Sequence, residues 1–333
     1  MLSVIIVTWN GLRYLPDCLA ALLPQLPSAA EVIIVDNGSA DGTCAWLQLH
    51  YPDIITVALQ ENAGFAGGTV VGMRVARGDL LLLLNNDAFV EPGFIAALLD
   101  VMDMGTDIGA AGGVLTFAHR PDLVASAGIR LRRDGVALDL WPGHHVNNLP
   151  LYPVAIAGPS GAAALYRRAM LEDVGLLEPS FFAYLEDVDL ALRGLLRGWQ
   201  SVVVPTARAR HVYSATSGQG SPFKQRLLGR NRLRVLVRCF PTSLLLRCLP
   251  AILLYDILAV SYAVVRRQPA MIEGRLAALR ELPRLLRERH EIQKRRTVAC
   301  ADIECWLEPW AWPWATLREQ QRLDALLASR PSV

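Results

Sequence analysis

The chain has 333 residues, of which 53% are hydrophobic and 19% charged, and its formal net charge is +2. This composition excludes a disordered chain, which requires low hydrophobicity. Six cysteines in a chain of this length also exclude a small disulfide scaffold, and the length suits one large domain or two smaller ones.

The first hundred residues alternate between predicted strands and predicted helices. Short apolar runs rich in β-branched residues and leucine predict buried strands at 2–8, 31–35, 54–59 and 80–84. Helical spacing of apolar residues predicts helices at 14–23, 43–50 and 69–77. This alternation, with short connections, is typical of a parallel sheet covered by helices on both faces.

Polar clusters follow three of these strands, at residues 36–41, 62–68 and 85–87. All three fall at the carboxyl ends of strands, where ligands bind in such sheets. A carboxylate such as Asp36 can there accept hydrogen bonds from a base or a ribose, whereas Asp41 also suits a helix N-cap. Asp87 is placed to bind a hard cation beside phosphates, and the alternative is a loop carboxylate facing water.

The middle of the chain is less regular. Residues 110–166 suggest mixed or antiparallel strands, with a tight turn at 158–161. Helices are predicted at 168–174 and 190–197, and a strand at 201–204. His211 then opens a polar stretch, and a lone histidine is more often structural or exposed than a metal ligand.

Three carboxylates, Glu186, Asp187 and Asp189, fall within four residues beside aromatic side chains. Such dense charge is costly unless it is paired, bound to metal or catalytic. Crowding separates the pKa values of such groups, which suits a general base. The alternative is an acidic first turn of the following helix, which fits Asp189 better than Glu186.

The charge is divided unevenly along the chain. Residues 1–219 carry 13 basic and 21 acidic side chains, a net of −8, whereas residues 220–296 carry 17 and 5, a net of +12. The basic region contains the apolar stretch 243–265, and an apolar stretch flanked by arginines favours an anionic membrane surface. Nucleic acid is the competing partner, but the region offers few aromatic side chains for base stacking.

Residues 243–265 are long enough to span a bilayer, yet they include Arg247, Pro250 and Asp256. Because charges are costly at the bilayer centre, an interfacial or re-entrant helix is favoured over a full span. Seven arginines are expected to pair with lipid phosphates: Arg226, Arg230, Arg232, Arg234, Arg238, Arg266 and Arg267.

A second basic helix is predicted at 275–296, broken at Pro283. Four tryptophans near the C-terminus suit a membrane interface, or an aromatic plug against the region or a partner chain. The alternative for the whole region is a helical subdomain or the dimer interface of a homo-oligomer.

With these residues described, four blocks resemble family 2 glycosyltransferases of the GT-A fold, in the rhamnosyltransferase-like branch. They are residues 3–10 (SVIIVTWN), 32–43 (VIIVDNGSADGT), 62–68 (NAGFAGG) and 84–87 (LNND). The resemblance runs from about residue 1 to residue 215. It implies an α/β fold with a mostly parallel sheet flanked by helices and a catalytic domain at 1–220. The basic, apolar residues 221–333 are expected, from their composition, to form a helical, membrane-associating region.

The resemblance also implies roles for single residues. Asp187 occupies the position of the general base. Asp87 ends the family's metal-binding motif, in which Asn85 replaces the first acid, and His211 stands where related enzymes place a metal-ligating histidine. The nucleotide sugar would be bound by Thr8, Asn10, Asp36, Asn62, Gly67, Asn85, Asn86, Gly161 and Glu186.

These roles imply an inverting transfer of a sugar, with rhamnose the first candidate, from a nucleotide-diphosphate donor to a hydroxyl of a glycan or lipid-linked acceptor. The cofactor would be Mg²⁺ or Mn²⁺. The first residues do not resemble a signal peptide, so the catalytic domain is expected in the cytosol, on the cytoplasmic face of the membrane. The alternatives are a nucleotidyltransferase of related sheet order and a non-catalytic nucleotide- or glycan-binding module.

Overall fold

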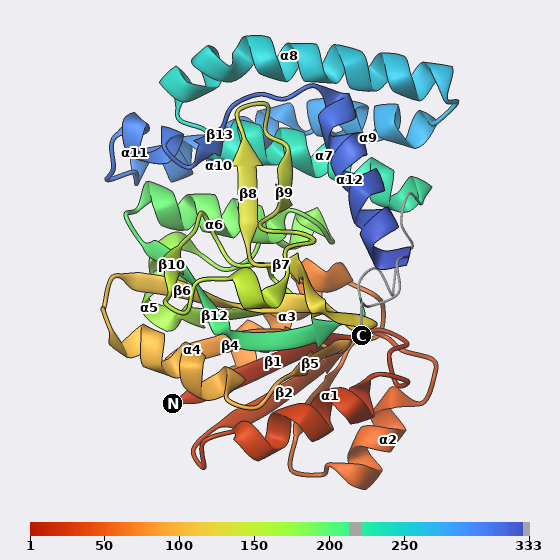
Figure 1. The fold of residues 1–333 in the computed structure, drawn as a ribbon, viewed down its shortest axis with the longest axis vertical. Helices are drawn as coiled ribbons and strands as arrows, with labels where there is room; N and C mark the ends of the chain where they lie inside the picture. The colour runs from red at the N-terminus through yellow and green to blue at the C-terminus, as the bar shows by residue number, and fades with distance from the viewer. Residues whose placement is uncertain (213–220, 329–333) are drawn as a thin grey trace.

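The computed structural model describes residues 1–212 and 221–328, and its centre is one mixed sheet (Figure 1). The strand order is β10-β12-β6-β11-β4-β1-β2-β3, with β5 paired to β12 and β7 paired to β6. Four strands form the parallel half that the sequence predicts: β1 (Leu2–Thr8), β2 (Glu31–Asp36), β3 (Ile55–Ala58) and β4 (Leu80–Asn85).

The other half of the sheet is mixed, as expected for residues 110–166. Its strands are β5 (Ala88–Val90), β6 (Ile108–Phe117), β7 (Arg120–Ser126), β10 (Val154–Ala155), β11 (Ala163–Arg167) and β12 (Gln200–His211). Strand β11 runs antiparallel between β4 and β6, whereas β12 runs parallel to β6. A second, three-stranded sheet has the order β13 (Leu307–Glu308), β8 (Ile129–Arg132) and β9 (Ala137–Asp139).

Helices cover both faces of the large sheet, because its central strands are apolar on both sides. Val4 and Ile6 of β1 face one core with α1 (Leu15–Leu22) and α4 (Phe94–Asp103), and Ile5 faces the other with α3 (Gly64–Val75) and α5 (Arg168–Val174). Helix α2 (Thr43–His50) packs near β3.

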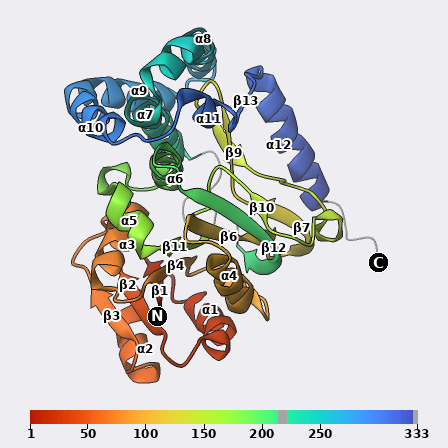
Figure 2. The same cartoon turned by 90° about the vertical axis from the view of Figure 1, so that its left-hand side faces the viewer.

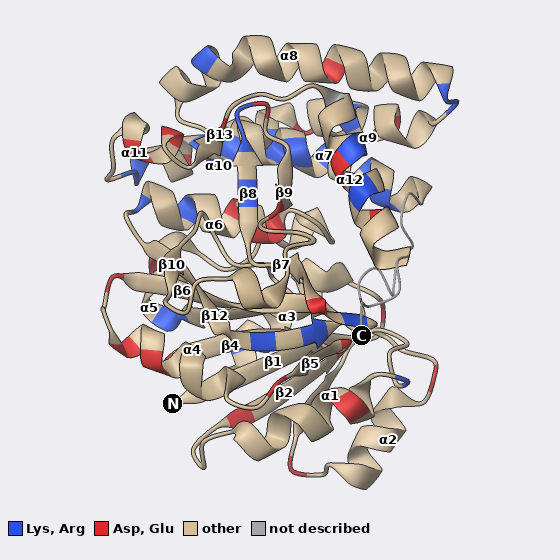
Figure 3. Ribbon diagram, in the orientation of Figure 1, with Lys and Arg blue, Asp and Glu red and all other residues tan. Residues whose placement is uncertain are grey.

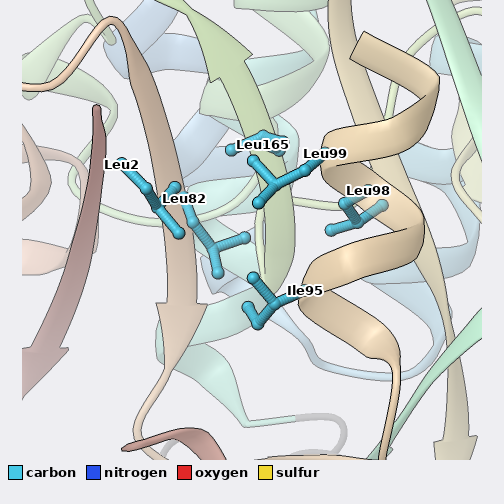
Figure 4. Close-up of a pocket in the computed structure, with 6 residues that line it drawn as sticks. All are labelled: Leu2, Leu82, Ile95, Leu98, Leu99 and Leu165. Atoms are coloured by element: carbon cyan, nitrogen blue, oxygen red, sulfur yellow. The ribbon is translucent and has the colours of Figure 1, made fainter. Parts of the chain in front are cut away.

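A small hollow lies under α4, where aliphatic side chains of three strands meet the helix (Figure 4). Its lining residues are Leu2, Leu82, Ile95, Leu98, Leu99 and Leu165. With no polar group in its lining, this hollow belongs to the packed core and cannot bind a nucleotide sugar.

The C-terminal region is helical, as expected, and packs over α6 (Glu186–Leu196). Its helices are α7 (Pro222–Cys239), α8 (Thr242–Val265), α9 (Pro269–Arg280), α10 (Leu282–Lys294), α11 (Cys300–Glu304) and α12 (Pro313–Ala328). Figures 1 and 2 both place α8 at the outer end of the molecule, with α7 and α9 between it and the sheet.

Several predicted boundaries are wrong. Helix α3 begins at Gly64 rather than at residue 69, because glycine permits the left-handed backbone (φ +76°) from which the helix starts. Helix α6 begins at Glu186 rather than at residue 190, so the acidic cluster forms its first turn. The strand predicted at 201–204 is part of the twelve-residue β12, which ends at His211. Residues 213–220 of the predicted polar stretch lie outside the described residues.

The predicted second basic helix is two helices, α9 and α10, which meet at Glu281. Helix α9 already begins at Pro269, so the predicted start at residue 275 is also wrong. Pro283 lies in the first turn of α10, where proline is tolerated because the N–H it lacks would have no helical partner.

Four of the arginines expected at lipid phosphates are instead paired inside the protein. Arg232 is 2.8 Å from Asp256, Arg238 is 2.7 Å from Asp189, and Arg234 pairs with Glu281. Arg230 donates to backbone carbonyls. These partners lie on distant segments, so part of the +12 charge of the region is neutralised within the protein. Figure 3 shows where the basic and acidic residues lie along the ribbon. Arg226, Arg266 and Arg267 are exposed.

Candidate active site

The parallel strands bring the predicted nucleotide residues together at one edge of the sheet. Thr8 at the end of β1 pairs in register with Asp36 of β2, and Val7 pairs with Asn85 of β4. The side-chain amide of Asn86 donates a 3.0 Å hydrogen bond to the hydroxyl of Thr8. Residues far apart in sequence therefore line one edge, as the strand ends predict.

The loop after β2 is organised around Asp36, which is almost fully buried. Its carboxylate accepts hydrogen bonds from the Ser39 amide at 3.3 Å and from the Cys44 thiol at 2.8 Å. Burial, followed by this hydrogen bond, raises the pKa of Cys44 to about 11, so the thiol stays protonated. Asn10 reaches the same loop, because its side-chain oxygen accepts from the Ala40 amide at 2.8 Å.

Asn37 holds the glycine-rich loop against β2, and the sequence analysis did not single it out. Its side chain donates to Asn62 Oδ1 at 3.0 Å and accepts from the Ala63 amide at 3.0 Å. Asn62 also accepts from the Gly64 amide at 2.8 Å. The predicted residue Asn62 thus shapes this loop, and Gly67 follows in the body of α3.

The two predicted metal ligands lie side by side. His211 Nε2 is 3.1 Å from Asp87 Oδ1 and 3.3 Å from the side-chain amide of Asn85. Asp87 lies between the end of β4 and the start of β5. His211 lies at the end of β12, which pairs with β5. A carboxylate and an imidazole at this separation fit a shared divalent cation.

Two protein ligands leave most of a cation's coordination sites for other oxygens. Among residues 1–212 and 221–328, no group of three or more histidine, cysteine or acidic side chains is placed to hold a metal ion. Mg²⁺ in particular is commonly bound through one or two carboxylates together with substrate phosphates and water. The donor set therefore suits a cation that arrives with a diphosphate.

Asp187 is anchored by two backbone amides. Its Oδ2 accepts from Gly161 at 3.0 Å, and its Oδ1 accepts from Val188 at 2.8 Å. Ala162, the residue after Gly161, connects this carboxylate to the sheet edge. Its carbonyl accepts a 2.9 Å hydrogen bond from the backbone N–H of Asn85. The desolvation of Asp187 raises its pKa, while the Gly161 and Val188 amides oppose the rise.

The three carboxylates of the cluster have three different environments. Glu186 is buried, with one carboxylate oxygen that has no hydrogen-bond partner among the residues that the structure describes. Burial followed by the charge of Asp187 raises its pKa to about 8. Asp189 is fully buried, but its ion pairs with Arg238 and Arg193 overcome the desolvation and lower its pKa to about 2. Asp189 is therefore structural, and Glu186 and Asp187 are the groups suited to proton chemistry.

The turn that precedes this cluster is strained. Phe182, Tyr184 and Leu185 all have positive φ angles, between 66° and 68°. Residues other than glycine held in such conformations cost about 1–3 kcal/mol each, and such strain concentrates at functional sites. The turn also contacts the glycine-rich loop, because the Ala66 amide donates to the Phe182 carbonyl at 3.0 Å.

Asp139 is a second residue that the sequence analysis missed. It ends β9, and its negative charge acts on both Asp187 and Lys224. The ammonium of Lys224 lies 5.2 Å from the centre of the Tyr184 ring. No short motif surrounds Asp139, so only the three-dimensional fold identifies it.

Comparison with known proteins identifies the family of the chain. The sequence profile described as glycosyl transferase family 2 matches residues 3–175. An N-acetylglucosaminyl-diphospho-decaprenol L-rhamnosyltransferase of Mycobacterium tuberculosis is 29% identical over 245 residues, which cover 66% of this chain and 78% of that protein.

Solved structures share the fold at low sequence identity. GalNAc-T7 with UDP, GalNAc and Mn²⁺ superposes with a TM-score of 0.62 at 15% identity, covering 92% of this chain and 57% of that one. A Pyrobaculum calidifontis mannosyltransferase with GDP-Man and Mn²⁺ gives 0.51 at 17% identity, covering 98% and 84%. The chain belongs to glycosyl transferase family 2 and is a glycosyltransferase with the GT-A fold.

Proposed function

We propose that this enzyme moves a sugar from a nucleotide-diphosphate donor to a hydroxyl of a glycan or lipid-linked acceptor, with inversion at the anomeric carbon. The observation that carries the proposal is the shared Gly161-Ala162 segment. It binds the Asp187 carboxylate on one side and the Asn85 backbone of the Asp87 loop on the other. A candidate base and candidate diphosphate-binding residues are thereby fixed to one short segment.

In the proposed reaction, Asp187 removes the proton of the acceptor hydroxyl. The hydroxyl oxygen forms its bond to the anomeric carbon as the bond from that carbon to the diphosphate oxygen breaks. The electron pair leaves with the nucleoside diphosphate, and a single displacement inverts the configuration. Glu186 stays protonated near neutral pH and would donate a hydrogen bond to the bound sugar.

Asp87 and His211 would hold a divalent cation, Mg²⁺ or Mn²⁺, at the diphosphate. When bound, the cation supplies positive charge that stabilises the departing diphosphate. Thr8, Asn10, Asp36 and the neighbouring strand ends would bind the nucleotide. Two structural neighbours contain Mn²⁺ together with UDP or GDP-Man, and this supports the same assignment here.

The donor and the acceptor are proposed from the mycobacterial relative. Its name specifies rhamnosyl transfer to N-acetylglucosaminyl-diphospho-decaprenol, a lipid-linked sugar. We therefore take dTDP-rhamnose as the first donor and UDP-hexoses as the next, with a lipid-linked glycan of the cell envelope as acceptor. Family membership favours glycosyl transfer over nucleotidyl transfer and over a module that only binds.

The test is a screen of nucleotide sugars for release of nucleoside diphosphate, with and without EDTA, on the wild type and on Asp187→Asn. We expect one donor class to be turned over, EDTA to abolish turnover, and the variant to bind nucleotide without transferring sugar. Wild-type turnover by Asp187→Asn would disprove the assignment of the base. Full activity in EDTA would disprove the metal site.

We further propose that the C-terminal region (221–333) places the catalytic domain (1–220) on the cytoplasmic face of the membrane. Helix α8 has the length and hydropathy of a membrane span. Only 22% of its most apolar stretch is buried in the protein, so most of that stretch is free to contact lipid. Asp256, its one acidic residue, is 2.8 Å from both Arg232 and Arg275, so this face of the helix is held against α7 and α9. The exposed side of the same helix carries Leu246, Leu253 and Ile257.

A helix with one face paired to protein and one apolar face suits an interfacial position better than a full span. Exposed Arg266 and Arg267 at its end would contact lipid phosphates. Flotation with vesicles that contain anionic lipid should carry the protein upward. If the protein does not float and is a dimer in solution, the apolar face of α8 would instead be the contact surface for a second copy of the chain.

A further inference from the structure

The turn that precedes the candidate base is held from outside the sheet, by helix α7. Asn231, in the middle of α7, is completely buried. Its side-chain nitrogen lies 3.0 Å from the Phe181 carbonyl, 2.9 Å from that of Ala183 and 2.8 Å from that of Tyr184. One amide group thus contacts three carbonyls of a single turn.

Only a donor can do this, because all three partners are acceptors. Aspartate would place a negative charge against the carbonyls, and leucine of similar volume would leave them without this donor. The side-chain oxygen of Asn231 is also used, since it accepts from Arg230 Nε at 3.0 Å. The orientation of the amide is therefore fixed at both ends.

Neighbouring arginines of α7 extend the same contact. Arg230 donates to the carbonyls of Ser180 and Phe181, at 2.9 Å each. Arg234 donates to the Ser180 carbonyl, and its guanidinium lies 5.5 Å from the centre of the buried Phe181 ring. Since residues three and four apart share one helix face, Arg230, Asn231 and Arg234 form a single clamp.

The clamp acts where the backbone is strained. Phe182, Tyr184 and Leu185 all have positive φ, and helix α6 with Glu186 and Asp187 begins at the next residue. Strained conformations persist only where the surroundings impose them. The hydrogen bonds from α7 help to impose this one, together with the Ala66 amide, which donates to the Phe182 carbonyl.

We propose that Asn231, with Arg230 and Arg234, is a positioning residue that holds the 181–185 turn so that Asp187 is aimed at the acceptor hydroxyl. This inference rests on the proposed function of Asp187. It also gives the C-terminal region a second role, because α7 then completes the catalytic machinery in addition to any contact with the membrane.

The experiment compares Asn231→Leu with the wild type in the full chain. A misplaced catalytic group can cost about 100-fold in rate, so kcat should fall by about that factor. The Michaelis constant for the donor should stay within about threefold, because the nucleotide residues are not contacted. Hydrogen–deuterium exchange over residues 181–188 should become faster.

The pH profile separates positioning from simple loss of folded enzyme. The Gly161 amide lowers the pKa of Asp187, so a loosened turn that weakens this bond should move the rising limb of the kcat profile to higher pH. A merely structural role would lower kcat by one factor at every pH. Arg289→Ala is the matched control, because Arg289 binds the carbonyls of Val237 and Phe240 in α7 without touching the turn.

Arg230→Met is made in parallel, in case Asn231→Leu does not fold. It removes hydrogen bonds at the half-buried edge of the clamp, where a substitution should leave the fold intact. It should show a smaller shift in the same direction. Unchanged exchange over 181–188 with an unshifted pH limb, in whichever variant folds, overturns the proposal. Asp187→Asn tests the proposed function separately. If this variant were active, the assignment of Asp187 as the base would be refuted, and not the clamp alone.

Discussion

The carboxylate of Asp187 lies 3.0 Å from the backbone amide of Gly161, so a residue at the start of α6 is bonded to the segment that enters β11. A carboxylate held by two backbone amides keeps one orientation and remains able to accept a proton. Its neighbour Glu186, by contrast, is buried, and one of its carboxylate oxygens has no hydrogen-bond partner in the described part of the chain. This difference leads to separate predictions for the two residues.

Glu186→Gln should stabilise the protein in a pH-dependent way. Burial and the charge of Asp187 raise the pKa of Glu186 from 4.5 to about 8, so the folded state holds a proton that the unfolded state releases. Below pH 4.5 both states are protonated and the substitution should be neutral. As pH rises from 4.5 to 8 the wild type loses stability, and the variant should gain a few kcal/mol at pH 8. Urea unfolding at pH 4 and pH 8 measures this, and an equal gain at both values would contradict it.

Asp189→Asn should destabilise the protein strongly. Removing one partner of a buried ion pair typically costs about 3–5 kcal/mol, because Arg238 and Arg193 would remain buried with less compensation. The ion pairs lower the pKa of Asp189 from 3.8 to about 2, so its contribution is present above pH 3.8 and is lost as pH falls through 2. Asp79→Asn, at an exposed ion pair with the N-terminus, is the control and should leave the stability nearly unchanged.

His211→Ala should weaken metal activation more than donor binding. With Asp87 as the remaining protein ligand, we expect the half-saturating Mn²⁺ concentration to rise by about tenfold or more. Titration of activity with Mn²⁺ at saturating donor gives the value. The exposed His290 provides the control variant, His290→Ala, which should behave as wild type. Identical Mn²⁺ titrations for wild type and His211→Ala would remove His211 from the metal site.

The double variant Leu253→Glu with Ile257→Glu should abolish flotation with anionic vesicles. The two side chains are 53% and 63% exposed and stand one helical turn apart on α8, so charges there oppose burial in lipid at little cost to folding. Leu49→Glu, at a leucine of α2 that is even more exposed, should still float. Retained flotation of the double variant would assign membrane contact to another surface.

The parallel half of the sheet follows from local sequence, because β1, β2 and β4 are continuous apolar runs bounded by polar clusters. The positions of Thr8, Asp36 and Asn85 at one edge follow in turn from the topology of parallel strands. The start of α3 could not be read in the same way, because glycine has a low helix propensity and Gly64 is chosen for its backbone conformation.

The ion-pair partners of the arginines in α7 could not be predicted from the neighbouring sequence. Their carboxylates belong to Asp189, Asp256 and Glu281, and each pair is separated by at least 24 residues. Asn231 carries no local signal either, because its acceptors are backbone carbonyls that any sequence supplies. From the charge counted along the segment, seven arginines were expected to contact lipid. In the folded chain, four of these seven arginines are paired within the protein.

The hydrogen bond from Asn231 to the Tyr184 carbonyl spans 47 residues of sequence. During synthesis the 181–185 turn leaves the ribosome well before α7 does, and it then lacks the donors that hold its left-handed backbone. A nascent chain with a complete nucleotide-binding edge would thus remain unable to transfer sugar. The enzyme should become competent only when its C-terminal helices have folded back onto α6, late in its production.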